Sequence, residues 1–157
     1  MKKLLAIFIV IITIFLCSCS KESKFGAEQF VERMNSSFDT NLETKSFRLS
    51  KRGENKFFFS TDDTSMTALI VDNDNNIKGI SILITADGDI ENTKTTFCQM
   101  CSVFTGNSYE NQVTIFNESN FFDNIKFTDG NSLITVGRFK YTVVSNTYSI
   151  TFMCDRV

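Results

Sequence analysis

The thiols of three cysteines are the side chains of this sequence best suited to chemistry. Cys98 and Cys101 form a Cys-x-x-Cys motif, and Cys154 lies close to the C-terminus. Such a motif can act as a redox pair or supply half of a metal site. A redox pair of the thioredoxin type has its reactive thiol at a helix N-terminus, where the helix dipole lowers the thiol pKa. Here the motif falls about two turns inside the helix that the sequence predicts over residues 90–105.

Metal binding by these thiols is not expected. A structural zinc site takes four Cys or His ligands, but the chain has no histidine, and beyond its first 19 residues only Cys98, Cys101 and Cys154 remain of its five cysteines. We therefore expect no metal and no cofactor. Cys98, Cys101 and Cys154 are interpreted as core thiols or as candidates for one structural disulfide, whose pairing the sequence leaves open. Thiol-redox chemistry by Cys98 and Cys101 is the alternative.

The absence of histidine also excludes the Ser-His-Asp triad, the Cys-His pair and the HExxH zinc site. Hydrolysis by two carboxylates alone stays open, but no distinctive motif surrounds any pair of acidic residues. Lysine and arginine are scattered among Asp and Glu, so a nucleic-acid partner is not expected. The sequence therefore favours a binding or interaction domain over an enzyme.

One acidic segment resembles the start of a calcium-binding loop. Asp72-Asn73-Asp74-Asn75-Asn76 places oxygen ligands at positions 1, 3 and 5 of an EF-hand pattern. Ile77 then occupies the sixth position, where the pattern requires Gly, and Leu83 occupies the twelfth, where it requires Glu. We therefore predict a hairpin turn, because Asn and Asp tolerate positive φ.

The N-terminus has the basic and apolar parts of an export signal. Met1-Lys2-Lys3 is basic, and the run from Leu4 to Leu16 is apolar except for Thr13. The run is shorter than the roughly 20 residues that a membrane-spanning helix needs, and it has the length of a signal-peptide core. The sequence therefore predicts a targeting segment.

Leu16-Cys17-Ser18-Cys19 ends this segment. The tetrapeptide resembles the lipobox of bacterial lipoproteins, which reads Leu, small residue, small residue, Cys; Cys17 is a less usual occupant of its second position. The resemblance implies that Cys19 is joined to diacylglycerol and becomes the mature N-terminus after cleavage. It also implies that the membrane is a partner through this lipid anchor, and that the protein lies on the extracytoplasmic face of the cell membrane.

We divide the chain into a lipoprotein signal peptide (1–18), a tether (19–24) and one α+β domain (25–157). Apolar residues recur with helical spacing in some stretches and with a period of two in others. The predicted helices cover 26–38, 90–105 and a stretch after Ser108, and the predicted strands lie near 47–50, 56–60, 66–71 and 80–84 and in a C-terminal hairpin. This pattern predicts one antiparallel sheet of about six strands with helices packed on one face, in the order α-β-β-β-β-α-α-β-β.

The C-terminal hairpin and the strand that contains Phe57-Phe58-Phe59 carry specific predictions of which side chains face the core. The C-terminal hairpin is predicted to begin with one long strand that has Leu133, Thr135, Gly137, Phe139, Tyr141 and Val143 on one face, and to return with Tyr148, Ile150 and Phe152. Phe57-Phe58-Phe59 sends aromatic rings to both faces of its strand. We expect a core role for most of these rings, and one of the three to mark an interface with a protein or small-ligand partner.

Overall fold

The computed structural model describes residues 25–52, 55–123 and 125–157. The predicted signal peptide, lipobox and tether lie outside these residues. In chain order the described elements are α2 (Ala27–Phe38), the 3-10 turn η1 (Thr44–Ser46), β1 (Arg48–Arg52), β2 (Asn55–Thr61), β3 (Ser65–Val71), β4 (Ile77–Thr85), α3 (Ile90–Thr105), α4 (Tyr109–Glu118), β5 (Gly130–Val136), β6 (Phe139–Ser145) and β7 (Ser149–Arg156). The predicted α+β class is confirmed.

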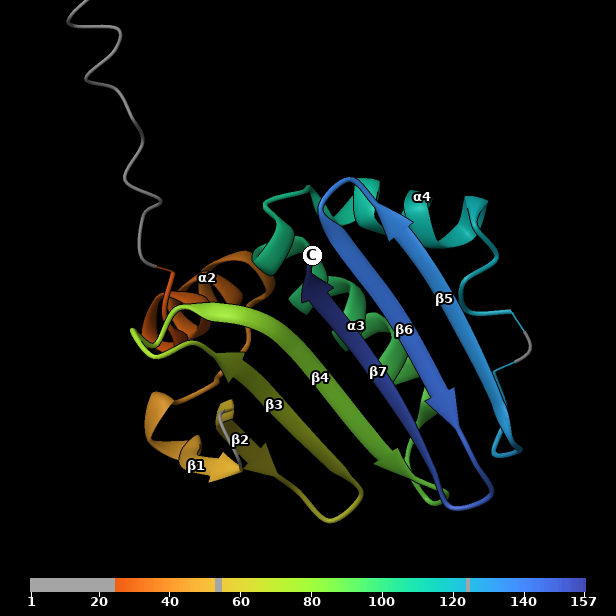
Figure 1. The fold of residues 1–157 in the computed structure, drawn as a ribbon, viewed down its shortest axis with the longest axis horizontal. Helices are drawn as coiled ribbons and strands as arrows, with labels where there is room; N and C mark the ends of the chain where they lie inside the picture. Colours follow the sequence, from red (N-terminus) through yellow and green to blue (C-terminus); the bar gives the residue numbers. More distant parts are fainter. Residues whose placement is uncertain (1–24, 53–54, 124) are drawn as a thin grey trace, which may run out of the picture.

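The described strands form one antiparallel sheet in the order β1-β2-β3-β4-β7-β6-β5 (Figure 1). The first four strands run as a meander. The chain then leaves the sheet through α3 and α4, returns at the far edge as β5, and ends with β7 between β6 and β4. Figure 1 shows the helices on one side of the sheet, as the sequence predicts.

The sheet has seven strands where the sequence predicted about six, because the predicted long C-terminal strand is two strands. Gly137 adopts φ of 59°, which allows a tight turn between Val136 and Phe139. The prediction that the alternate residues from Leu133 to Val143 share one face of a single strand is therefore wrong. Ile134 pairs with Tyr141, so Leu133 points to the face opposite Tyr141.

Polar caps fix the ends of the two helices that follow β4. The Asp89 carboxylate accepts a hydrogen bond from the Asn92 amide at 3.0 Å and begins α3. Gly106, with φ of 79°, ends it. Ser108 Oγ accepts from the Asn111 amide at 3.2 Å and begins α4. The predicted bounds of α3 are confirmed because this cap, this glycine and the apolar spacing agree.

The segment that resembled a calcium loop is the turn between β3 and β4. Asp72 Oδ1 accepts hydrogen bonds from the backbone amides of Asp74 at 2.8 Å and Asn76 at 2.9 Å, and Asn75 has φ of 63°. The carboxylate oxygen thus serves the turn itself, and the predicted hairpin is confirmed.

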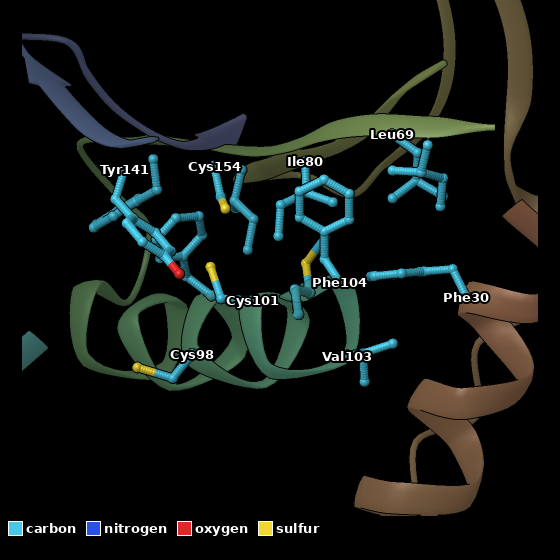
Figure 2. Close-up of a cluster of buried hydrophobic side chains, with 14 of the residues drawn as sticks. Phe30, Leu69, Ile80, Cys98, Cys101, Val103, Phe104, Tyr141 and Cys154 are labelled. Atoms are coloured by element: carbon cyan, nitrogen blue, oxygen red, sulfur yellow. The ribbon is translucent and has the colours of Figure 1, made fainter. Parts of the chain in front are cut away.

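The core lies between the helices and one face of the sheet, which we call the inner face. Leu69, Ile80, Cys154 and Tyr141 are cross-strand neighbours on β3, β4, β7 and β6, and all four are fully buried. Figure 2 shows their side chains pointing toward α3. At the β1 edge this row ends in Leu49, which is 60% exposed, because the described helices do not reach that strand.

Candidate functional site

The structure separates the two thiols of the Cys-x-x-Cys motif. Figure 2 shows the Cys101 side chain pointing from α3 toward Cys154 on β7, whereas Cys98 points away from the sheet. All three cysteines are buried and carry free thiols. The thiol next to Cys101 is therefore Cys154, and Cys98 has a different environment on the far side of the helix.

Burial keeps the two thiols of the Cys-x-x-Cys motif protonated. It raises the pKa of the Cys98 thiol to about 12. Burial also raises the pKa of Cys101, and a hydrogen bond with the Cys154 thiol adds to this effect. The thiolate is the reactive form of cysteine, so the geometry gives no activated nucleophile at neutral pH. The motif also lies well inside α3, away from the positive end of the helix dipole.

A buried glutamine beside these thiols was not found from the sequence. Gln112 of α4 is fully buried, and its Oε1 accepts long hydrogen bonds of 3.4 Å from Tyr141, Thr105 and Asn107. Its Nε2 has no partner among the described residues. A glutamine in an amphipathic helix is ordinarily a surface residue, so no sequence signal marked it. An unpaired buried amide costs stability, and this one lies deep between α4 and β6.

The face of the sheet turned away from the helices, the outer face, carries a broad apolar surface. Its apolar members are Phe57, Phe59, Met66, Ala68, Ile70, Leu83, Leu133, Val144 and Met153. Met66 is 37% exposed and Val144 43%, while both outer phenylalanines are half-buried by their neighbours. No described helix covers these side chains. A contiguous exposed apolar surface of this kind marks an interaction site in soluble domains.

The run Phe57-Phe58-Phe59 divides between the two faces. Phe58 packs against the core beneath the helices, and its neighbours Phe57 and Phe59 lie on the outer face. Phe59 belongs to a row that crosses the sheet through Ala68 and continues through Ser81 to Met153. Two of the three rings therefore face away from the core.

One carboxylate borders this surface. Asp155 of β7 lies opposite Gly79 of β4, and a side chain at Gly79 would overlap the Asp155 carboxylate. Burial raises the pKa of Asp155, and the charge of Lys140, its partner on β6, opposes this shift. The glycine thus gives room for an acidic group to lie against the sheet, next to the apolar rows.

Three hollows lined by described residues lie away from the thiols. Two of about 400 Å³ and 380 Å³ lie at the N-terminal ends of α2 and α4, and one of about 210 Å³ lies between α2, α3 and the inner face of β2 and β3. None of these is lined by a cysteine. Within the described residues no group of three or more Cys, Asp or Glu side chains is placed to hold a metal ion.

The fold and site together define a small α+β domain with a seven-stranded antiparallel sheet that is covered on one face. The sequence matches no protein-family model, no curated protein and no solved structure. Among the described helices, none has the length and apolar character needed to cross a bilayer.

We predict that the three domain thiols react slowly in the native protein. Iodoacetamide near neutral pH should modify Cys98, Cys101 and Cys154 at least about 100-fold more slowly in the native full-length chain than in denaturant, because burial restricts access to all three and also suppresses ionisation of Cys98 and Cys101. Peptide mass spectrometry follows each cysteine separately. Met66→Cys on the outer face is the exposed control. Native labelling of Cys98 or Cys101 as fast as this control would contradict the core assignment and favour the redox alternative.

Proposed function

We propose that this protein is a lipid-anchored component of a bacterial cell envelope, held on the extracytoplasmic face of the cell membrane, whose domain binds a protein partner without catalysis. The outer face is the observation that carries the binding part of the proposal. The lipobox-like tetrapeptide ending in Cys19 supports the anchor.

Hydrogen bonds hold the segment before α2 against the sheet. The Phe25 carbonyl accepts a hydrogen bond from the Ile77 amide at 2.8 Å, and Gly26 forms a bridge with Asn76. Phe25 and Gly26, which follow the proposed tether in the sequence, therefore lie beside the turn between β3 and β4. Lipoprotein anchors carry two or more acyl chains, which hold a protein stably where one chain gives marginal binding.

A protein partner suits the outer face better than a small molecule does. Small ligands bind in concave sites that enclose most of their surface, whereas this surface is one side of an open sheet. Aromatic residues and methionine are enriched in the cores of protein interfaces. The outer face offers Phe57, Phe59, Met66 and Met153, and the charged pair Asp155 and Lys140 lies at its border.

The thiol-redox alternative is not favoured by a specific observation. It needs an accessible thiolate, and the pKa values of Cys98 and Cys101 are raised by burial. The unpaired amide of Gln112 is equally enclosed and is aimed at no hollow that a substrate could enter.

Replacement of the proposed lipid-bearing cysteine tests the anchor. Cys19→Ser should leave the precursor unprocessed and abolish labelling by a palmitate probe, because a hydroxyl cannot form the thioether. Cys17→Ser is the matched control and should keep processing and labelling. Unchanged labelling of Cys19→Ser in a bacterial host would show that the chain is not a lipoprotein of this type.

Photo-crosslinking in the native host tests the binding face. A photoreactive amino acid at Met66 should yield one discrete protein adduct, whereas the same group at Leu49, an even more exposed residue facing the other side, should not. Ser81→Glu places a charge in the middle of the outer face and should remove the Met66 adduct. Equal adducts at both positions, or an adduct that survives Ser81→Glu, would contradict binding through this face.

A further inference from the structure

The two edges of the sheet differ in their protection against pairing with another strand. Natural edge strands avoid such pairing by carrying charges, proline or bulges. The edge strand β1 carries Arg48 and Lys51, both exposed. The opposite edge strand, β5 (Gly130–Val136), has the sequence Gly-Asn-Ser-Leu-Ile-Thr-Val, with no charged residue and no proline. The β1 edge, which we call the guarded edge, is therefore protected by charge, and the β5 edge has no such protection.

Within the described residues, the backbone of β5 pairs with β6 alone. Its seven residues pair with β6 in one continuous register without a bulge. No backbone hydrogen bond within the described residues joins β5 to any segment other than β6. Leu133 at its centre is 57% exposed. A strand of this length with unpaired amides and carbonyls is a template for a further strand.

We infer that two copies of this chain pair antiparallel through β5 and form a twofold-symmetric dimer with one continuous sheet. In the register centred on the strand, Leu133 lies opposite Leu133 of the second copy, and Asn131 lies opposite Thr135. Every such pair is uncharged. The exposed leucines then cover one another, and the unpaired groups of both edges are satisfied.

The two edge strands allow three pairings: β5 with β5, β1 with β1, and β1 with β5. Charge and closure of the assembly favour the first. Pairing of β1 with a second β1 would bring the cations Arg48 and Lys51 of both copies into one short strand pair, and like charges close together across a strand pair are destabilising. Pairing of β1 with β5 is head-to-tail and leaves an open edge at each end of a growing series. Pairing of β5 with β5 closes the assembly, because both remaining edges are the charged β1 strands.

The dimer also extends the proposed binding face. A twofold axis between antiparallel strands of one sheet is perpendicular to that sheet, so both helical layers lie on the same side. The two outer faces then adjoin along a seam that includes Leu133 and Val144. The pairing does not depend on the lipid anchor or on a partner, so its failure would leave the proposed function untouched.

Cysteine crosslinking of the full-length chain in bacterial cells tests this dimer. Leu133→Cys should form a disulfide-linked dimer under mild oxidation, because opposed Cα atoms in an antiparallel pair lie within disulfide reach. Leu49→Cys is the matched control, since Leu49 is similarly exposed on the guarded edge. It should give no dimer, and neither should the unsubstituted chain. A dimer band of equal strength for both variants, or none for Leu133→Cys, would overturn the proposal.

The register is tested by mixing two differently tagged chains, one with Asn131→Cys and one with Thr135→Cys. The antiparallel pair predicts a mixed dimer in excess of either self-linked dimer, and an excess of self-linked dimers would overturn it. Leu133→Lys added to both chains should reduce the mixed dimer by about tenfold or more, because two lysines then oppose each other at the axis. Leu49→Lys should leave it unchanged. Loss with both lysine variants, or with neither, would contradict pairing through β5.

Discussion

The packing of α3 on the inner face of β4 and β7 is the interaction on which the rest of the structure depends. The ring centroid of Phe97 lies 5.5 Å from that of Phe152 on β7, 5.8 Å from that of Phe116 on α4 and 6.4 Å from that of Phe121. The Phe97 ring thus joins both helices to the centre of the sheet. Buried aromatic contacts of this kind contribute packing energy beyond their buried area. They also direct the helices to one face, which leaves the outer face free.

Because one face of the sheet is covered by helices, the cysteines, which are the most reactive residue type of the domain, are buried and unreactive. Cys101 and Cys154 fill space between α3 and β7, and the burial that makes the core stable also raises the pKa of Cys101. The same burial leaves the Nε2 atom of Gln112 without a partner among the described residues. Among the described residues, exposed apolar side chains of the outer face such as Met66, Leu133 and Val144 are instead accessible to other molecules.

The parts of the fold that could be predicted are those in which local signals agree. The spacing of Phe97, Cys101 and Phe104, the acidic start at Asp89 and the final Gly106 define α3 from sequence. The prediction of the C-terminal strands was wrong because the alternation of apolar and polar residues runs on through Gly137. A tight turn at this glycine ends β5, and the residues of β6 therefore face the opposite way from those predicted. A single glycine in such a pattern does not show whether the strand continues or reverses.

The site was less predictable because it depends on contacts between distant segments. The thiol motif was visible, but the neighbour of Cys101 is Cys154, more than fifty residues away. The outer face arises from β2, β3, β4, β5, β6 and β7 together, so the Phe57-Phe58-Phe59 run could suggest an interface without showing which rings face it. The burial of Gln112 likewise follows from how α4 meets β6 and from no feature of its own helix.

Methionine oxidation of the purified full-length chain tests the central claim most directly, because the chain has reporters on both faces of the sheet. Met34 and Met100 lie in the core with exposures of 1% and 2%, and Met66 and Met153 lie on the outer face. With dilute hydrogen peroxide and peptide mass spectrometry, the account predicts that Met66 and Met153 form sulfoxide at least about tenfold faster than Met34 and Met100. Equal rates at all four positions, or faster oxidation of Met34 and Met100, would contradict a sheet covered on one face and open on the other.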